Sequence, residues 1–445
     1  MPLYGPITTL FGVGLEVYFQ RKEVQGTLPG GPLLVVANHP NGIMDPALLG
    51  HIFRRRLRFL GKEPLFRMPV ISLLVKGTGT LPVYRTKDGA DTSANEEMFR
   101  AVYQSLDEGE AICLFPEGIS HNEPNLQPLK TGAARMAFGA EHDVRSKSGR
   151  ELQLKIVPVG IVYQDKRRFR SSVSISVGEP ISLDNYKDLY DDNEREAVQK
   201  LTQDIDVAIR EQTLNLDAWS DMPLLHLAER IWDEGLDPKG HDEDIRLRQL
   251  SMAFYELQQH QPERARGIQN KVASFYERMQ KLGLNAADLD TEPKISKVLR
   301  FSAYNLIALV LGTPIALLGT LFFALPYGAI RLIAGRRKER DLVATVALFA
   351  GALIFPTWTF LMAAAASFYL PLAWVLPMLF WMPLCGLYAN RFFRRRRESL
   401  REIQLFFTFS LSKRLRKHIA EERAELATDM NELEVLVRQQ RGEFY

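Results

Sequence analysis

The apolar residues of the first part of the chain recur in a strand-and-helix rhythm. Short apolar runs occupy Leu33–Ala37, Leu81–Tyr84, Ala111–Phe115, Ile156–Val162 and Val173–Val177. Longer stretches with helical periodicity lie between them, for example Thr92–Glu108 and Leu129–Glu141, and Asp45-Pro46 opens another helix. Alternation of strands with helices predicts an α/β core around one sheet.

The C-terminal part has a different pattern. Residues 342–390 contain no charged side chain. This length suffices for two helices of ~20 residues across a bilayer, so we predict a transmembrane hairpin with spans at 342–366 and 371–390. A second uncharged run covers 301–330. The chain is therefore expected to be an integral membrane protein with a large water-soluble part.

Basic clusters flank the apolar segments and bear on topology. They are Lys294, Lys297 and Arg300; Arg336, Arg337, Lys338 and Arg340; and Arg391 with Arg394–Arg397. If all three stay cytoplasmic, the segment 301–333 enters and leaves on one side. Thirty helical residues reach ~45 Å, which is long for one crossing and short for two. We expect a re-entrant element there, with a single tilted span as the alternative.

The patterns divide the chain into five parts. The expected boundaries are an interfacial N-terminal helix at 1–24, an α/β domain at 25–215, a helical region at 216–293, membrane segments at 294–397 and a charged amphipathic helix at 398–445. No basic segment precedes the apolar residues 3–19, so we expect no secretory signal. An ordinary core helix is the alternative to an interfacial one, and self-association is one option for the C-terminal helix.

Composition narrows the classes of function. A net charge of +3 over 445 residues gives no argument for nucleic-acid binding. Cys113 and Cys385 lie far apart in apolar runs, which offers no disulfide framework. The eight histidines show no ligand spacing with cysteines or carboxylates, so no metal is expected.

The run from His39 to Asp45 carries the first candidate chemistry. A neutral imidazole can take a proton from an alcohol, and a carboxylate can fix its tautomer and stabilise the imidazolium. Asp45 before Pro46 also fits a helix N-cap, which is the alternative. The chain has no Gly-x-Ser-x-Gly elbow, so we expect the substrate to bring its own hydroxyl.

Three further stretches offer polar groups at strand ends. Arg85 ends the run Gly79–Arg85, where a guanidinium suits a phosphate, although a surface arginine is the alternative. Glu117 and Gly118 follow Pro116 at a strand-to-loop edge, and Glu117 is expected to hold a substrate hydroxyl or to pair with Arg85. Adjacent Ser120 and His121 rarely align as nucleophile and base. Pro158 in Ile156–Tyr163 indicates an edge or a pocket-lining bend, with packing in the core as the alternative.

In this order and spacing, the four stretches resemble the motifs of the glycerolipid (PlsC-like) acyltransferase superfamily over about residues 25–185. Gly79–Arg85 matches Gly-x5-Arg, Phe115–Gly118 matches Phe-Pro-Glu-Gly, and Pro158 marks the fourth motif. Five residues, not the usual four, separate His39 from Asp45. This longer spacing is similar to that of the yeast-type glycerol-3-phosphate and dihydroxyacetone-phosphate acyltransferases, as is the phrase from Ser120-His121 to Gly132.

The resemblance implies a PlsC-like core, a mixed sheet flanked by helices, and a set of roles. His39 would be the general base and Asp45 would orient it. The substrate-binding residues would be Arg85 and Lys130 for the acceptor phosphate, Glu117 and Gly118 for the glycerol part, with Asn38, Ser120 and Pro158 completing the site. Acyl-CoA or acyl carrier protein would be the co-substrate, with no other cofactor.

The function expected from the resemblance is acyl transfer to glycerol-3-phosphate or dihydroxyacetone phosphate in phospholipid synthesis. The catalytic domain would be cytoplasmic, at a bacterial inner membrane or the endoplasmic reticulum. Expected partners are the lipid bilayer, acyl-CoA and a phosphate-bearing glycerol acceptor, and the oligomeric state stays open. The alternatives are a lysophosphatidic acid acyltransferase and a non-catalytic membrane scaffold with the same fold.

Overall fold

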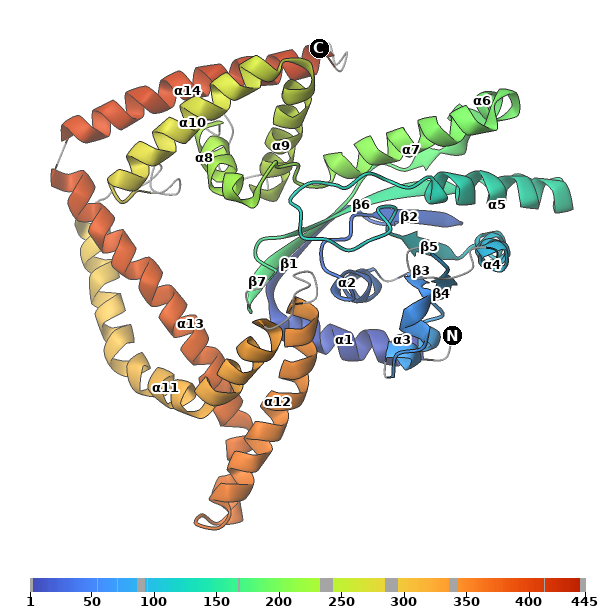
Figure 1. The fold of residues 1–445 in the computed structure, drawn as a ribbon. Coiled ribbons are helices and arrows are strands. Elements are labelled where there is room, and N and C mark those ends of the chain that lie inside the picture. Colours follow the sequence, from blue (N-terminus) through green and yellow to red (C-terminus); the bar gives the residue numbers. More distant parts are fainter. Residues whose placement is uncertain are drawn as a thin grey trace. The chain divides into compact units, whose positions relative to one another are not determined.

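A computed structural model describes most of the chain as two compact units (Figure 1). The described residues are 3–53, 55–69, 71–85, 93, 95–166, 169–232, 243–284, 295–335, 343–411 and 413–440. The first unit comprises Met1–Trp219 with Arg337–Leu348, and the second Ser220–Arg336 with Phe349–Tyr445. Lys294, the basic cluster at 336–340 and residues 441–445 of the expected C-terminal helix lie outside the described residues.

Eight strands among the described residues of the first unit form one mixed sheet. They are β1 (Phe19–Gln25), β2 (Leu33–Ala37), β3 (Leu57–Lys62), β4 (Leu81–Val83), β5 (Ala111–Leu114), β6 (Lys155–Tyr163), β7 (Ser171–Val177) and β8 (Ile181–Ser182). The order is β1-β7-β6-β2-β5-β3-β4, with β8 also paired to β6. Strands β6, β2, β5, β3 and β4 run parallel, whereas β7 and β8 run antiparallel to β6.

Helices cover both faces of this sheet, which explains why its central strands are apolar throughout. All five residues of β2 are buried. Helices α1 (Tyr4–Tyr18) and α2 (Met44–Ile52) pack on one face, and α4 (Asn95–Asp107), α5 (Gly132–Ser148) and α7 (Glu194–Glu211) on the other (Figure 1). Short helices α3 (Ile71–Gly77) and α6 (Lys187–Asp192) complete the unit. The predicted α/β fold class is confirmed.

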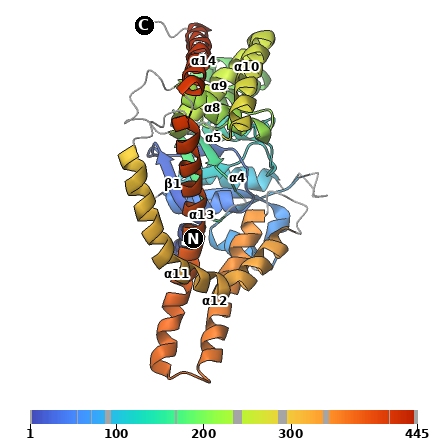
Figure 2. The same cartoon turned by 90° about the vertical axis from the view of Figure 1, so that its left-hand side faces the viewer.

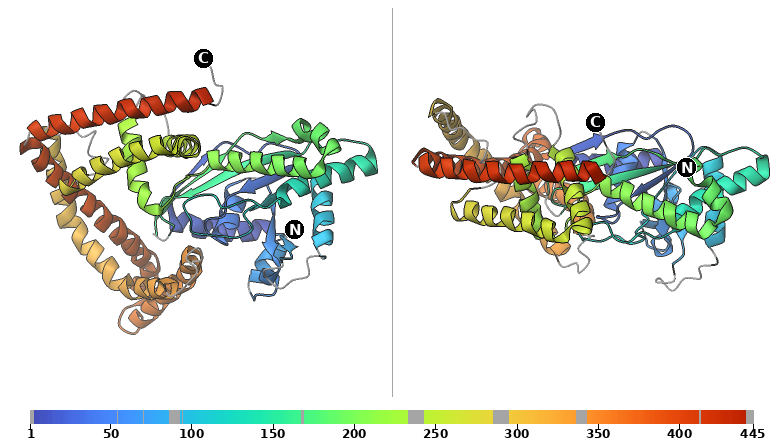
Figure 3. Two further views of the ribbon diagram at one scale, coloured as in Figure 1. Left: turned by 45° about the horizontal axis from the view of Figure 1, so that its top comes forward. Right: turned by 90° about the horizontal axis from the view of Figure 1, so that it is seen from above.

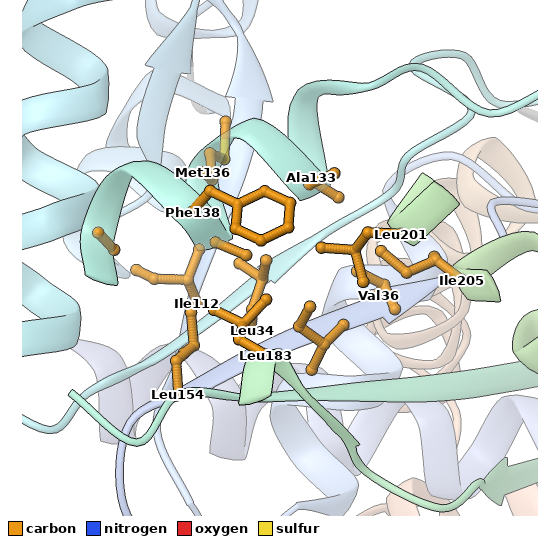
Figure 4. Close-up of a cluster of buried hydrophobic side chains, with 14 of the residues drawn as sticks. Leu34, Val36, Ile112, Ala133, Met136, Phe138, Leu154, Leu183, Leu201 and Ile205 are labelled. Atoms are coloured by element: carbon orange, nitrogen blue, oxygen red, sulfur yellow. The ribbon is translucent and has the colours of Figure 1, made fainter. Parts of the chain in front are cut away.

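Alternate residues of the strands fill two separate hydrophobic clusters. Leu34 and Val36 of β2 meet Phe138 of α5 and Leu201 of α7 (Figure 4). Leu33 and Val35 point the other way, into the cluster that contains Leu15 and Leu48. The period of two along a strand thus ties both helical layers to the same sheet.

Pro158 lies in an interior strand, so the prediction of an edge strand is wrong. It pairs with Val36 of β2 on one side of β6. On the other side, β6 pairs with β8 at residues 155–156 and with β7 from residue 159 onward. Pro158 falls between these two partners, where a strand residue without an N–H costs no ladder hydrogen bond.

The second unit contains a four-helix bundle of α8 (Met222–Trp232), α9 (Glu243–His260), α10 (Pro262–Lys281) and α14 (Lys413–Gln440). Helix α14 runs antiparallel alongside α10 (Figure 3), with ion pairs Lys271–Asp429 at 2.6 Å and Arg278–Glu422 at 3.1 Å. The expected helical region and the expected C-terminal helix therefore pack on each other. The latter begins at Lys413, because the preceding helix continues well past residue 398.

Three apolar helices follow: α11 (Ile295–Gly335), α12 (Val343–Ala366) and α13 (Leu372–Leu411). They belong to the second unit, except that α12 begins in the first. All three are long and apolar enough to cross a membrane, over Ala308–Ile333, Val346–Ala366 and Leu372–Arg395. Helices α12 and α13 form a hairpin, and α11 is bent (Figure 2). Helix α11 contains Pro314 and Pro326, and proline inside a helix is an established cause of bending.

Candidate active site

The parallel strands bring the candidate residues to one edge of the sheet. His39 lies two residues after β2, Arg85 two residues after β4, and Glu117 three residues after β5. Tyr163 is the last residue of β6. Because these strands run in one direction, their carboxyl ends share an edge, which is where open α/β sheets bind ligands. The topology therefore collects residues that are far apart in the sequence.

His39 and Asp45 form a direct pair. Nδ1 of His39 lies 2.8 Å from Oδ2 of Asp45, whose side chain is fully buried. The same oxygen accepts the Asn41 N–H at 2.7 Å. A carboxylate only accepts, so Nδ1 carries the proton and Nε2 presents a lone pair. Asp45 thus reaches the imidazole, and it is Ile43, not Asp45, that occupies the N-cap position of α2.

The His39 ring is held flat against an aromatic ring. It stacks on Phe115 with a centroid distance of 4.0 Å and an interplanar angle of 10°. The side chain keeps 18% of its surface exposed. No residue in the described part of the chain forms a hydrogen bond with Nε2. This nitrogen is therefore available to a hydroxyl that enters from solvent.

Glu117 holds the loop that carries His39. Its Oε1 accepts the His39 N–H at 2.8 Å, and its Oε2 accepts the Gln127 N–H at 2.8 Å and the Nε2 of His121. The His121 N–H in turn donates to the His39 carbonyl at 3.2 Å. The side chain of Glu117 is fully buried. Both oxygens accept hydrogen bonds from the protein, so Glu117 braces the loop that carries His39.

Two cationic side chains meet at Gly118. Nη1 of Arg85 donates to the Gly118 carbonyl at 2.7 Å. Gly118 has a φ of +69°, and a Cβ there would lie 2.8 Å from Nζ of Lys130. The N–H of Lys130 donates to the Pro116 carbonyl at 2.9 Å. The structure thus brings together the two expected phosphate ligands, one residue from the carboxylate that braces His39.

The side chain of Asn38 makes a structural contact in the site. Its amide group donates to the Ile161 carbonyl at 3.0 Å and accepts the Ile161 N–H at 2.7 Å. The side chain therefore joins the end of β2 to β6, where the backbone ladder between them has ended. Pro158 is buried within β6, so it faces the core of the sheet.

Ser120 and His121 do not form a nucleophile–base pair. Ser120 is half-buried in the loop after β5. The His121 ring uses Nε2 toward Glu117, and its Nδ1 accepts the Glu123 N–H at 3.2 Å. Both ring nitrogens are thus engaged elsewhere. The sequence argument against this pair agrees with the geometry.

Two polar residues of the site were not predicted from the sequence. Tyr163 donates its hydroxyl hydrogen to Oδ1 of Asp45 at 2.7 Å. Nζ of Lys166 donates to the carbonyls of Pro40 and His121. The available signal was their place at the end of the apolar run that contains Pro158. In the described part of the chain no cluster of three potential metal ligands occurs.

Comparison with known proteins gives this domain a family. Residues 17–162 match the family model described as Acyltransferase. Residues 17–162 therefore form an acyltransferase domain. This match confirms the resemblance to the PlsC-like superfamily. It also confirms the prediction that the protein is an acyltransferase.

Two curated proteins illustrate the range of the family. The chain is 32% identical over 164 residues to glycerol-3-phosphate O-acyltransferase 2 of Saccharomyces cerevisiae, which covers 37% of this chain and 20% of the yeast protein. It is 26% identical over 128 residues to a chloroplastic 1-acyl-sn-glycerol-3-phosphate acyltransferase of Brassica napus, which covers 28% of this chain and 36% of that protein. The chain thus spans about a fifth to a third of these relatives.

One of the solved structures to which the chain is similar is an acyltransferase. It is the crystal structure of the 1-acyl-sn-glycerophosphate acyltransferase PlsC from Thermotoga maritima, with a TM-score of 0.35 and 18% identity. The match covers 47% of this chain and 77% of that one.

Proposed function

We propose that the chain transfers a fatty acyl group from a thioester to the free hydroxyl of glycerol-3-phosphate or dihydroxyacetone phosphate. One observation carries the proposal: the unpartnered Nε2 of His39 lies on the same sheet edge as the cations Arg85 and Lys130. A base and an anion site together suit an acceptor that bears both an alcohol and a phosphate. Acyl-CoA or acyl carrier protein is the donor that we infer.

The proposed reaction needs no enzyme-bound acyl group. Nε2 of His39 takes the proton of the acceptor hydroxyl as its oxygen attacks the thioester carbonyl. The imidazolium is stabilised by Asp45 through Nδ1. When the tetrahedral intermediate collapses, the carbon–sulfur bond breaks and the imidazolium returns the proton to the thiolate. An ester and a free thiol result, and His39 is again neutral.

An acceptor assay tests this function. Purified protein in liposomes with labelled acyl-CoA is expected to acylate glycerol-3-phosphate or dihydroxyacetone phosphate. Product from lysophosphatidic acid alone would favour the second acceptor class, which the Brassica relative acts on by its name. His39→Ala is expected to abolish turnover, whereas His142→Ala, which changes an exposed histidine of α5, is expected to retain it. Equal activity of wild type and His39→Ala, or none in either, would favour the scaffold.

We infer that the two ends of α11 lie on the same side of the membrane. Helix α11 follows α10 of the four-helix bundle. The segment after α11 leads to Leu348, which packs against Gly14 of α1 in the first unit. Trp219 and Ser220 join the two units, and no candidate span occurs among the described residues before α11. Both ends of α11 therefore connect to the same aqueous compartment.

The packing of α11 supports a re-entrant path. Its first half runs antiparallel to α13, since Gly312 meets Tyr388 and Gly319 meets Cys385. Its second half runs antiparallel to α12. There Trp358 donates to the Phe322 carbonyl at 2.7 Å, and Ile330 meets Gly351. Because α12 and α13 are the two arms of a hairpin, α11 descends along one arm and returns along the other (Figure 2).

Cysteine accessibility tests this topology. Leu299→Cys and Lys338→Cys are expected to react with an impermeant maleimide from the same side, and Ser367→Cys at the hairpin tip from the opposite side. Cys385→Ala provides the background. Burial raises the pKa of Cys113, so this thiol stays unreactive. Labelling of 299 and 338 from opposite sides would establish a single span instead.

We also propose that α1 lies at the bilayer surface. Leu10 and Val13 are 71% and 62% exposed, and Val17 continues the same face. Leu348 reaches Gly14 on this helix, and the candidate span that begins at Val346 starts there. An apolar helical face next to the entry point of a membrane helix is suited to contact with lipid.

A further inference from the structure

We propose that Tyr163 is a positioning residue of the catalytic site, which fixes the carboxylate of Asp45 and, through it, the imidazole of His39. The inference rests on the proposed function, because it concerns how well His39 works as a base. It assigns a task to the carboxyl end of β6, the strand that carries Pro158.

The contacts of Asp45 show why one further donor matters. Oδ2 accepts from Nδ1 of His39 at 2.8 Å and from the Asn41 N–H at 2.7 Å. Oδ1 accepts from the Tyr163 hydroxyl at 2.7 Å. Both side chains are buried. Without the hydroxyl, Oδ1 is a buried acceptor with no partner in the described part of the chain, and the carboxylate is free to turn away from the imidazole.

The backbone and ring contacts of Tyr163 fix the direction in which its hydroxyl points. Its backbone lies in β6, opposite Val173 of β7. Its ring packs against Phe19 with a centroid distance of 5.7 Å. Burial, and then the nearby charge of Asp45, raise the pKa of Tyr163 well above its usual value. The phenol therefore remains a donor at every pH at which the site operates.

The other ionisable groups around the pair make different contacts. They are Cys113 from β5, Glu117 and His121 from the loop after β5, Lys166 from the turn after β6, and Tyr18 from α1. Glu117 binds the backbone of His39, and Lys166 binds backbone carbonyls. Burial raises the pKa of the Cys113 thiol, which keeps it neutral. Tyr163, by contrast, donates its hydroxyl hydrogen to the Asp45 carboxylate.

Tyr163→Phe tests the inference in the liposome assay. We expect kcat to fall about tenfold, because the base is no longer held in line. The KM values for both substrates should change less than about twofold, since no substrate contact is removed. The acid limb of the kcat/KM profile should move to higher pH. A carboxylate that has lost a donor binds protons more tightly, and the imidazole beside it then keeps its proton to higher pH.

Tyr186→Phe is the matched control. The Tyr186 hydroxyl also donates to a carboxylate, Oδ2 of Asp204 at 2.6 Å, in the same unit but on the side of α7. Its loss should lower stability without moving the acid limb. A wild-type kcat and acid limb in Tyr163→Phe would overturn the inference while the proposed function stands.

A second variant guards against a folding defect. Incorporation of 3-fluorotyrosine at position 163 keeps the ring and makes the hydroxyl a stronger donor. We expect the acid limb to move to lower pH, opposite to Tyr163→Phe. An unchanged limb would overturn the inference. Absence of acyl transfer by the wild type on every acceptor would instead overturn the proposed function, and the inference with it.

Discussion

Nη1 of Arg85 lies 2.7 Å from the carbonyl oxygen of Gly118, the residue after the glutamate that braces His39. This hydrogen bond fixes the orientation of the guanidinium, so the loop after β5 holds both the proposed anion site and the proposed base. An acceptor phosphate bound there has its distance to the base determined by the protein. A substitution of Arg85 should therefore change the kinetics with the phosphate-bearing acceptor.

Arg85→Lys is expected to raise the KM for the phosphate-bearing acceptor about tenfold, because lysine cannot reproduce bidentate pairing. The KM for acyl-CoA should change little. Arg100→Lys is the control, since Arg100 is an exposed residue of α4 that pairs with Glu96. Equal effects of both substitutions on the acceptor KM would contradict a phosphate role for Arg85.

Glu117→Gln separates the bracing role from a substrate contact. The amide cannot accept from all the donors around Glu117, so we expect a loss of ~1–3 kcal/mol of stability and a lower kcat. Thermal unfolding and steady-state kinetics measure the two effects. A higher acceptor KM with unchanged stability would restore the substrate contact predicted from the sequence.

A polarity-sensitive probe at Val13 is expected to report lipid. In the Cys385→Ala background, a nitrobenzoxadiazole label on Val13→Cys should show blue-shifted emission in liposomes and quenching by lipid-borne quenchers. Val207→Cys is the control, since Val207 is also exposed but lies on α7, on the other face of the sheet. Water-like emission at both positions would argue for an ordinary surface helix.

Gly319→Leu is expected to disrupt the packing of α11 on α13. A Cβ at Gly319 would lie 2.1 Å from the Cys385 carbonyl oxygen, a backbone atom that cannot move aside. Helices that approach this closely in membranes depend on small residues. Gly328→Leu on the same helix meets nothing within 4 Å and should be tolerated. Detergent-solubilised protein should lose several degrees of thermal stability only in the first variant, and similar losses would contradict the contact.

The sequence predicts strands β2, β4, β5, β6 and β7 correctly but does not predict β1, β3 and β8. Strands β2, β5 and β6 are continuous apolar runs, so they can be recognised from their own residues without knowledge of the strands they pair with. Strand β1 reads Phe-Gln-Arg-Lys-Glu-Val-Gln and lies at the edge beside β7. Its polar residues suit an edge strand but carry no strand signal of their own, so pairing with β7 decides its conformation.

Some residues of the candidate site were predicted from the sequence and others were not. His39, Asp45 and Arg85 were found because their side-chain chemistry and order are visible along the chain. The bracing contacts of Asn38 and Glu117 were not, because their partners are backbone groups of distant segments. Tyr163 was missed for a related reason: its hydroxyl meets Asp45 across 118 residues of sequence. Such contacts exist only after the sheet has formed.

The antiparallel contact between α10 and α14 also sets an order of events during synthesis. Helix α14 leaves the ribosome after all three apolar helices, yet it completes a bundle whose other members were made before them. In the proposed topology, the bundle cannot close until the intervening segment has returned to the compartment where it started. If the apolar helices crossed the membrane an odd number of times, α14 would lie in the compartment opposite to α8, α9 and α10. The apolar face of these three helices would then stay uncovered. In the proposed topology, closure of the bundle thus depends on correct insertion of the apolar helices.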